Sequence, residues 1–242
     1  MKKIAEYWGI IRLTLITADI SARTVFQHWR GPLKMTRAWS DGTIQSWSRR
    51  LLNAAKVDLH VDNPHPLKVE PGKSYIVMCN HTSHFDIPIS LVAWSGYSLR
   101  MLAKKELYNI PLFGKAMSSA DFPIIDRVNR RQSLKDLAHA QELMKSGILV
   151  WVAPEGTRSK TGELGEFKRG AFLMAVQSKA IIIPMGIRGA EKILPAKSLG
   201  LHLGRKIEVS IGEPIDASQY TMKQQDELSA IVKSSIASLC GQ

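Results

Sequence analysis

Short runs of aliphatic and β-branched residues alternate with helical stretches from Val57 onward, and this alternation constrains the fold of the 242-residue chain most strongly. Strands are expected at Val57–Val61, Ser74–Cys79, Leu99–Ala103, Phe122–Asp126, Ile148–Ala153, Ala180–Ile187 and Lys206–Ile211. Helices are expected at Ile87–Trp94, Ile110–Ser118, Arg131–Lys145, Gly170–Lys179 and Met222–Leu239. The pattern predicts an α/β fold with a central, mostly parallel or mixed sheet of about seven strands flanked by helices.

Residues 1–56 differ from the remainder in composition. They hold ten Lys or Arg against three acidic residues, and four of the six tryptophans. Apolar residues recur at helical spacing from Ile4 to Trp29, and Gly31-Pro32 is expected to end that helix; a second set from Trp39 to Ala55 predicts another. Tryptophan combined with Lys and Arg is typical of a membrane interface. We therefore expect amphipathic membrane-association helices over 1–56 and an α/β domain over 57–242.

The charge of this segment favours a surface position over a membrane-spanning one. A charged residue at the bilayer centre costs about 2.5–3.5 kcal/mol, and Arg12 and Asp19 both interrupt the candidate span. A half-inserted helical hairpin stays open. The net charge of +12 predicts an anionic partner. Nucleic acid is disfavoured because the sequence has no zinc-finger spacing, no ribonucleoprotein-like aromatic motif and no basic helix with heptads. The expected partner is an anionic membrane surface.

The stretch "NHTSHFDIP", residues 80–88, carries the first candidate chemistry. A metal site would need further ligands, and the other histidines are scattered. A Ser83–His84–Asp86 triad is excluded because such close neighbours cannot pass a proton along a line. In the third interpretation, Pro88 starts a helix near Asp86, and the aspartate folds back beneath His81. The carboxylate then fixes the imidazole tautomer and makes a general base. Alone, the pair could equally cap a helix.

The stretch "VWVAPEGTRSKTGELGEFKRG", residues 150–170, follows a predicted buried strand and carries the second candidate site. Gly156 permits a close backbone approach, Thr157 offers a hydroxyl, and Arg158 offers a bidentate fork for phosphate or carboxylate. The segment is not a nucleotide P-loop, because no G-x4-G-K-[ST] occurs. Without further context, a solvated loop with a surface ion pair would explain it as well.

Together these motifs resemble the lysophospholipid or glycerolipid acyltransferases, also called H-x4-D acyltransferases. Besides "NHTSHFD" and "PEGTRS", the matching blocks are "AKKELYNIPLFG" (103–114), "FPIIDR" (122–127), "FKRG" (167–170) and "IIIPMGIRG" (181–189). The resemblance runs from about Tyr75 to Gly189. Ala153 stands where the family usually has an aromatic residue, which puts the chain-length or acceptor preference in doubt but not the reaction.

The resemblance implies transfer of a fatty acyl group from acyl-CoA or acyl carrier protein to the hydroxyl of a lysophospholipid, by default lysophosphatidic acid. It implies His81 as base and Asp86 as its partner, with no metal and no cofactor beyond the thioester co-substrate. The implied ligands of the acceptor's glycerol phosphate are Lys105, Arg127, Glu155, Gly156, Thr157 and Arg158. The expected location is the cytoplasmic face of a membrane. Open alternatives are another lysolipid or glycerol 3-phosphate as acceptor, a catalytically inactive lipid-binding protein of the same fold, and a metal-dependent hydrolase.

Overall fold

The computed structural model describes residues 2–31, 34–195 and 200–242, with side chains from Tyr7 onward. The elements in chain order are α1 (Lys2–Trp29), α2 (Arg37–Ala54), β1 (Asp58–Asp62), β2 (Tyr75–Cys79), α3 (Asp86–Ala93), β3 (Leu99–Met101), β4 (Ala103–Lys104), α4 (Phe113–Ser119), β5 (Ile124–Ile125), α5 (Arg130–Lys145), β6 (Leu149–Val152), α6 (Arg169–Gln177), β7 (Ile181–Arg188), β8 (Lys206–Ile211), β9 (Ile215–Asp216) and α7 (Gln225–Cys240). Most lie within a few residues of the sequence expectations.

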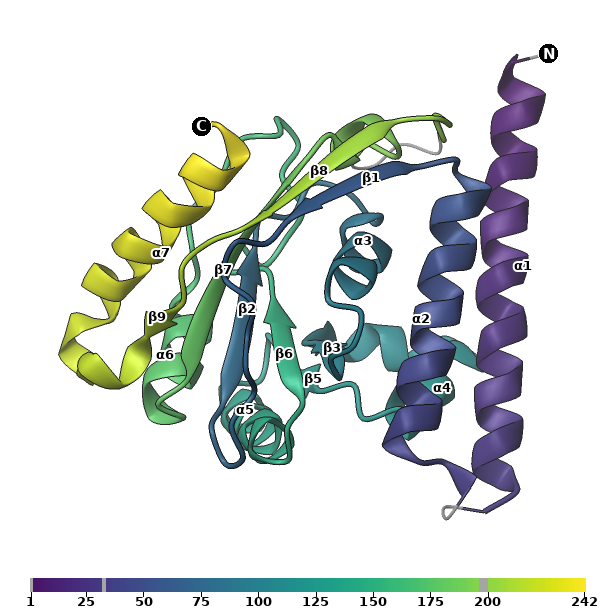
Figure 1. Cartoon of the computed structure of the whole chain (residues 1–242). Coiled ribbons are helices and arrows are strands. Elements are labelled where there is room, and N and C mark those ends of the chain that lie inside the picture. The colour runs from purple at the N-terminus through teal and green to yellow at the C-terminus, as the bar shows by residue number, and fades with distance from the viewer. Residues whose placement is uncertain (1, 32–33, 196–199) are drawn as a thin grey trace.

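One mixed sheet of seven strands organises the body, as the sequence predicts (Figure 1). The strand order is β1-β8-β7-β2-β6-β3, with β9 beside β7. Pairs β2–β6, β2–β7, β3–β6 and β1–β8 are parallel, and β8 and β9 run antiparallel to β7. Strands β2 and β6 are central and fully buried. The segments that leave their carboxyl ends therefore start from a rigid frame.

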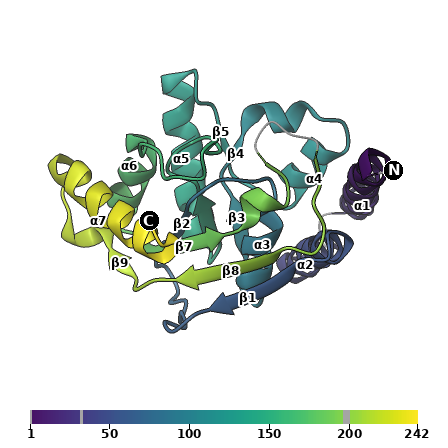
Figure 2. The ribbon, with the colours of Figure 1, turned by 90° about the horizontal axis from the view of Figure 1, so that it is seen from above.

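Helices cover both faces of this sheet, which explains why its central strands are apolar throughout rather than alternating. On β2, Val77 contributes to the core beneath α2 and α3, whereas Ile76 and Met78 contribute to the core beneath α5, α6 and α7. Figure 2 shows the two helix layers on opposite sides, with α1 outside α2. Alternate β2 side chains thus fill two separate cores, one on each side of the sheet.

Helix α2 packs against the α/β body. Ile44 and Leu52 lie in the core shared with α3, and Thr36 caps the helix by accepting from the Trp39 amide. Asp41 pairs with Arg100 of β3 at 2.8 Å, and the Arg100 side chain is 1% exposed. Removing one member of a buried ion pair is strongly destabilising. Deleting residues 1–56 would thus disturb the core, so substitutions on α1 are the sharper probes of attachment.

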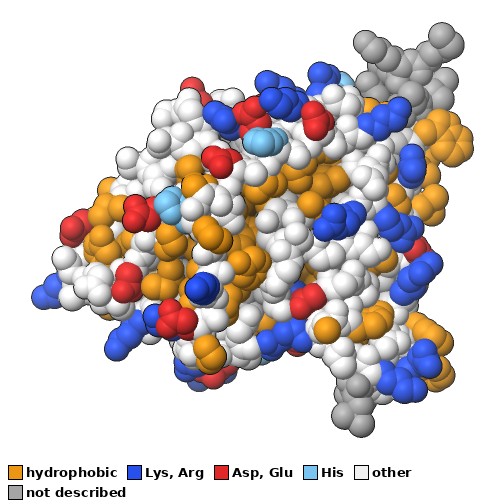
Figure 3. Space-filling model, in the orientation of Figure 1, with side chains coloured by type: hydrophobic (Ala, Val, Ile, Leu, Met, Phe, Trp, Pro, Cys, Tyr) orange, Lys and Arg blue, Asp and Glu red, His pale blue; other side chains and the backbone are white. Residues whose placement is uncertain are grey.

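Helix α1 packs against α2 and α4 and presents its outer face to the surroundings. Among its described side chains, from Tyr7 onward, the exposed large apolar ones are Tyr7, Trp8, Ile11, Leu15, Phe26 and Trp29. Figure 3 shows hydrophobic and basic side chains along the edge where Figure 1 places α1. No helix in the described ranges has an apolar stretch long enough to cross a membrane. The Ile4 side chain and Pro32, both used in the sequence argument, lie outside the described residues.

One strand expectation needs correction, and one strand of the main sheet was not expected. Residues 122–126 do not join the main sheet: only Ile124–Ile125 form a strand, and it pairs with β4 in a separate two-stranded sheet. Pro123 has no amide hydrogen to donate to a ladder, and the Asp126 carboxylate turns the chain by accepting from the amides of Val128 and Asn129. The seventh strand of the main sheet is instead β9, which is only two residues long and carries no periodicity.

Candidate functional site

The turn that carries the first motif begins where β2 ends. Asn80 is buried, and its side chain imitates a strand residue: Nδ2 donates to the Ile187 carbonyl at 2.9 Å, and Oδ1 accepts from the Ile187 amide at 2.8 Å. The register of β2 on β7 thereby continues one residue past Cys79. His81 consequently leaves the sheet from a fixed point.

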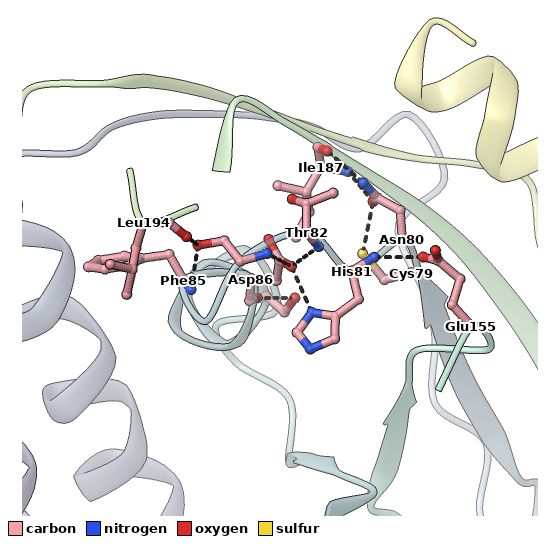
Figure 4. Close-up of polar contacts among 11 residues, drawn as sticks. Cys79, Asn80, His81, Thr82, Phe85, Asp86, Glu155, Ile187 and Leu194 are labelled. Carbon is pink, nitrogen blue, oxygen red and sulfur yellow. Dashed lines mark hydrogen bonds and ion pairs between the residues drawn. The ribbon is translucent and has the colours of Figure 1, made fainter. Parts of the chain in front are cut away.

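His81 and Asp86 meet as the third interpretation of the sequence expects. Helix α3 begins at Asp86, and Nδ1 of His81 lies 2.7 Å from Oδ2 of Asp86. The Asp86 side chain is fully buried, and His81 is 17% exposed. Within the ranges that the structure describes, Nε2 of His81 has no hydrogen-bond partner. The imidazole therefore has one nitrogen held by a carboxylate and one available to a substrate (Figure 4).

The Asp86 carboxylate is held by the turn that it closes. Besides the ring nitrogen, Oδ2 accepts from the amides of Thr82 and Ser83 at 2.7 and 2.8 Å. Charge-assisted bonds of this kind offset the cost of burying a carboxylate. Ser83 in turn ties the turn to the Leu194 carbonyl through its hydroxyl, at 2.9 Å. The geometry rules out Ser83 as a nucleophile activated by His84, since its hydroxyl serves this backbone contact.

The second motif lies beside the first because β6 is parallel to β2 and adjacent to it. Glu155 is 6% exposed and spans the gap between the two segments: Oε1 accepts from the His81 amide, and Oε2 accepts from the Gly165 amide, both at 3.0 Å. Gly156 has φ +76°, a conformation that favours glycine. The loop borders a cavity of about 480 Å³, and Thr157 and Lys168 are among the residues that line it.

The three predicted cations have different surroundings. Arg127 donates to the Gly156 carbonyl and so reaches the second motif. Lys105 pairs with Asp126 at 2.7 Å, next to Arg127 in sequence. Arg158 makes no such pair in the described part of the chain. It lies close enough to His84 to help lower the pKa of that imidazole, although burial is the larger cause. Among the three, Arg158 is the cation that has no ion pair or hydrogen bond within the described residues, and its charge acts on His84.

Sequence reasoning missed two residues that hold the base. The Ser159 amide donates to the His81 carbonyl at 2.7 Å. The Trp151 ring stands edge-to-face against the His81 ring, with centroids 5.7 Å apart. Trp151 lies in β6 and in the second motif, and Ser159 lies later in that motif. A prediction that β2 and β6 pair in parallel would have placed both residues beside His81. The described residues contain no group of three or more His, Cys, Asp or Glu that could hold a metal ion.

Comparison with known proteins identifies the family of this chain. The model of the Acyltransferase family matches residues 58–188, more than half of the chain. The matched range contains both motifs. The chain belongs to the acyltransferase family.

Curated relatives carry more specific names. A chloroplastic 1-acyl-sn-glycerol-3-phosphate acyltransferase of Arabidopsis thaliana is 34% identical over 159 residues, which is 66% of this chain and 44% of that protein. A probable 1-acyl-sn-glycerol-3-phosphate acyltransferase of Mycoplasma pneumoniae is 34% identical over 157 residues, 60% of this chain and 58% of that protein. The matches thus span only about half of these relatives' lengths.

A solved structure supports the fold along the whole chain. The crystal structure of the 1-acyl-sn-glycerophosphate acyltransferase of Thermotoga maritima superposes with a TM-score of 0.78. The match covers 99% of this chain and 98% of that one at 24% identity. This likeness extends to the N-terminal helices, which the family model does not include.

Proposed function

We propose that this protein transfers a fatty acyl group from a thioester to the free hydroxyl of lysophosphatidic acid, giving phosphatidic acid. The observation that carries the proposal is the 2.7 Å contact of the His81 ring with the buried Asp86 carboxylate at the end of β2. Family membership and the names of the curated relatives support the reaction class. An alcohol is a weak nucleophile until a base removes its proton, and this pair supplies a base without a protein nucleophile.

In the proposed mechanism, Nε2 of His81 accepts the proton of the acceptor hydroxyl as that oxygen attacks the thioester carbonyl. A carbon–oxygen bond forms, and the tetrahedral intermediate collapses by breaking the carbon–sulfur bond. The thiolate leaves and takes up the proton from the imidazolium. Asp86 stabilises the imidazolium while it carries that charge. One base therefore serves both halves of the reaction, and no acyl-enzyme forms.

The proposed acceptor subsite uses Arg158 and Arg127, with the backbone around Gly156 and the hydroxyl of Thr157. A guanidinium binds a phosphomonoester through two charge-assisted hydrogen bonds. Arg127 already contacts the backbone of this loop, so its charge lies beside the subsite. Lys105 supports this subsite indirectly, because its ion pair holds Asp126, the neighbour of Arg127 in sequence. The donor is acyl-CoA or acyl carrier protein, whose thioesters have the same reacting atoms.

Membrane association is proposed to occur through the outer face of α1, on the cytoplasmic side. Trp8 and Trp29 are 66% and 79% exposed, Arg12 and Arg23 are exposed on the same helix, and Arg30 is exposed directly after it. Aromatic rings prefer the headgroup region, and each Lys or Arg near an anionic surface contributes about 1 kcal/mol. An enzyme placed this way would reach its lysolipid within the lipid surface.

The proposed function is tested by measuring turnover with a panel of acceptors against both thioester donors. The panel contains lysophosphatidic acid, glycerol 3-phosphate, and lysolipids whose phosphate carries a further head group. Fastest turnover of lysophosphatidic acid is the expected result. Preference for another acceptor would replace the substrate assignment and keep the reaction, whereas lipid binding without turnover by folded protein would favour an inactive lipid-binding protein.

A further inference from the structure

The backbone of His81 is held on both sides by the segment after β6. Its amide donates to Oε1 of Glu155 at 3.0 Å, and its carbonyl accepts from the Ser159 amide at 2.7 Å. Asp86 fixes the imidazole and the turn that follows His81, through the ring and the amides of Thr82 and Ser83. The amide and carbonyl of His81 itself are held by Glu155 and Ser159, so the position of the ring also depends on that segment; Figure 4 shows the Glu155 contact.

Each oxygen of the Glu155 carboxylate accepts a hydrogen bond from a backbone amide. Its second oxygen accepts from the Gly165 amide at 3.0 Å, and the residue is 6% exposed. A buried carboxylate needs such donors to offset its desolvation. A phosphate placed against it would meet a like charge and would find no donor there. These contacts fit an anchor for the protein backbone, and they do not fit the expected role as a ligand of the acceptor's phosphate.

We infer that Glu155 is a positioning residue for the base: it sets the distance of His81 from the acceptor hydroxyl and does not bind the acceptor. This inference rests on the proposed function. It also gives the loop a second task. Arg158 lies between Glu155 and Ser159, the two residues that grip His81, so the segment that binds the acceptor also places the base. A misplacement on the order of 1 Å costs about 10²-fold in rate.

The first test replaces the carboxylate by an amide. In Glu155→Gln the side-chain NH₂ faces a backbone N–H, so one of the two anchoring bonds is lost. Turnover should fall by about tenfold or more while the KM for lysophosphatidic acid changes less than twofold. Glu213→Gln is the matched control, because it makes the same charge change at an exposed position away from this loop and its cavity. It should leave both parameters near those of the unmodified protein.

The second test keeps the Glu155 carboxylate and displaces it sterically. A Cβ on Gly165 would stand 3.2 Å from Oε2 of Glu155, and Gly165 has no positive φ that would strain an alanine. Gly165→Ala should therefore lower kcat in the same direction as Glu155→Gln. Gly170→Ala is the control, since a Cβ there meets nothing within 4 Å.

Two further measurements distinguish the positioning role of Glu155 from a purely structural one. Melting temperature reports folding, and the Nδ1–H proton signal of His81 reports the environment of the ring. In Glu155→Gln that signal should shift or broaden while the melting curve stays cooperative. The signal needs no turnover, so it tests the positioning role even if the panel assay finds no acyl transfer. An unchanged signal with an altered acceptor KM would overturn the inference and restore Glu155 as a ligand. Unchanged kcat in both loop variants would also overturn it.

Discussion

The turn after β2 and the loop after β6 lie side by side but are built in opposite ways. In the turn, Asp86 is fully buried and bonds to two amides and the His81 ring. In the loop, Thr157 is exposed, Arg158 is partly exposed, and the chain borders a cavity. The two segments touch where Glu155 and Ser159 grip His81.

The difference follows from what each segment has to do. A base must stand at a fixed distance from a proton, so its supports are buried, short and directional. A subsite for a charged head group must stay hydrated until the ligand arrives, so its cations keep access to water. The base and the head-group cations therefore lie in different loops, which meet where Glu155 and Ser159 hold the His81 backbone. Substitutions of His81 and of Arg158 should consequently affect different kinetic constants.

The largest effect is expected at the base. His81→Ala should reduce turnover by roughly three orders of magnitude, within the range of general-base catalysis. Asp86→Asn should cause a smaller loss, because a neutral amide can keep the hydrogen bonds to Oδ2 but stabilises the imidazolium less than a carboxylate does. Circular dichroism checks the fold, and His139→Ala on the exposed side of α5 is the control. Near-normal turnover by folded His81→Ala would remove this pair from the mechanism.

The next effect is expected in the loop. Arg158→Ala should raise the KM for lysophosphatidic acid by about tenfold, which corresponds to a lost interaction of about 1.4 kcal/mol. Arg158→Lys should rescue only part of this, because a point charge cannot replace a planar fork. Lys160→Ala, an exposed cation on the same loop, is the control. Equal changes in donor and acceptor KM would assign Arg158 to neither substrate specifically.

A smaller effect is expected from substitutions on α1. They test whether the acceptor reaches the loop from the membrane surface. Replacing Trp8 and Trp29 by Ala should weaken binding to anionic vesicles by roughly fivefold, since burying a large apolar side chain contributes about 1.5–3 kcal/mol when complete. The apparent KM for vesicle-borne acceptor should rise, and that for a water-soluble short-chain acceptor should not. Ile231→Ala removes an exposed apolar residue from α7 as control. Full vesicle binding by the double variant would move the interface away from α1.

The smallest effect is expected on acid stability, from the ion pair between Lys105 and Asp126. The hydrogen bond from Lys105 and those from the Asn129 and Val128 amides lower the pKa of Asp126 to about 2. A carboxyl with a lowered pKa stabilises the folded state fully above its unfolded pKa of about 3.9, and the contribution is lost as pH falls toward 2. Asp126→Asn should flatten acid unfolding over that window, and Asp58→Asn on exposed β1 should not. Unaltered acid unfolding of Asp126→Asn would show that the pair adds no stability.

The sequence predicted what is periodic or local. The strands and helices follow hydrophobic spacing, and Pro88 predicts the start of α3 that brings Asp86 back to His81. Both helices of residues 1–56 are present, and their proposed boundary as a separate unit stays a prediction. Helix α2 fills a core that also holds β2 and α3, which spacing within α2 alone could not show.

The sequence could not predict contacts between backbone groups and distant side chains. Glu155 bonds to an amide 74 positions away, so its residue type suggested a charge in a binding loop. Lys105 and Asp126 meet because β4 and β5 pair, and those strands are only two residues long. Such short strands carry no periodicity. The sequence therefore could not show that Lys105 is paired with an acidic residue and Arg158 is not.

The separation of the two loops is tested most directly by measuring kcat and acceptor KM for His81→Ala and Arg158→Ala side by side, with lysophosphatidic acid and one thioester donor. His81→Ala should lose about 10³-fold in kcat with little change in KM. Arg158→Ala should gain about tenfold in KM with little change in kcat. Losses of both variants in the same kinetic constant would contradict this separation.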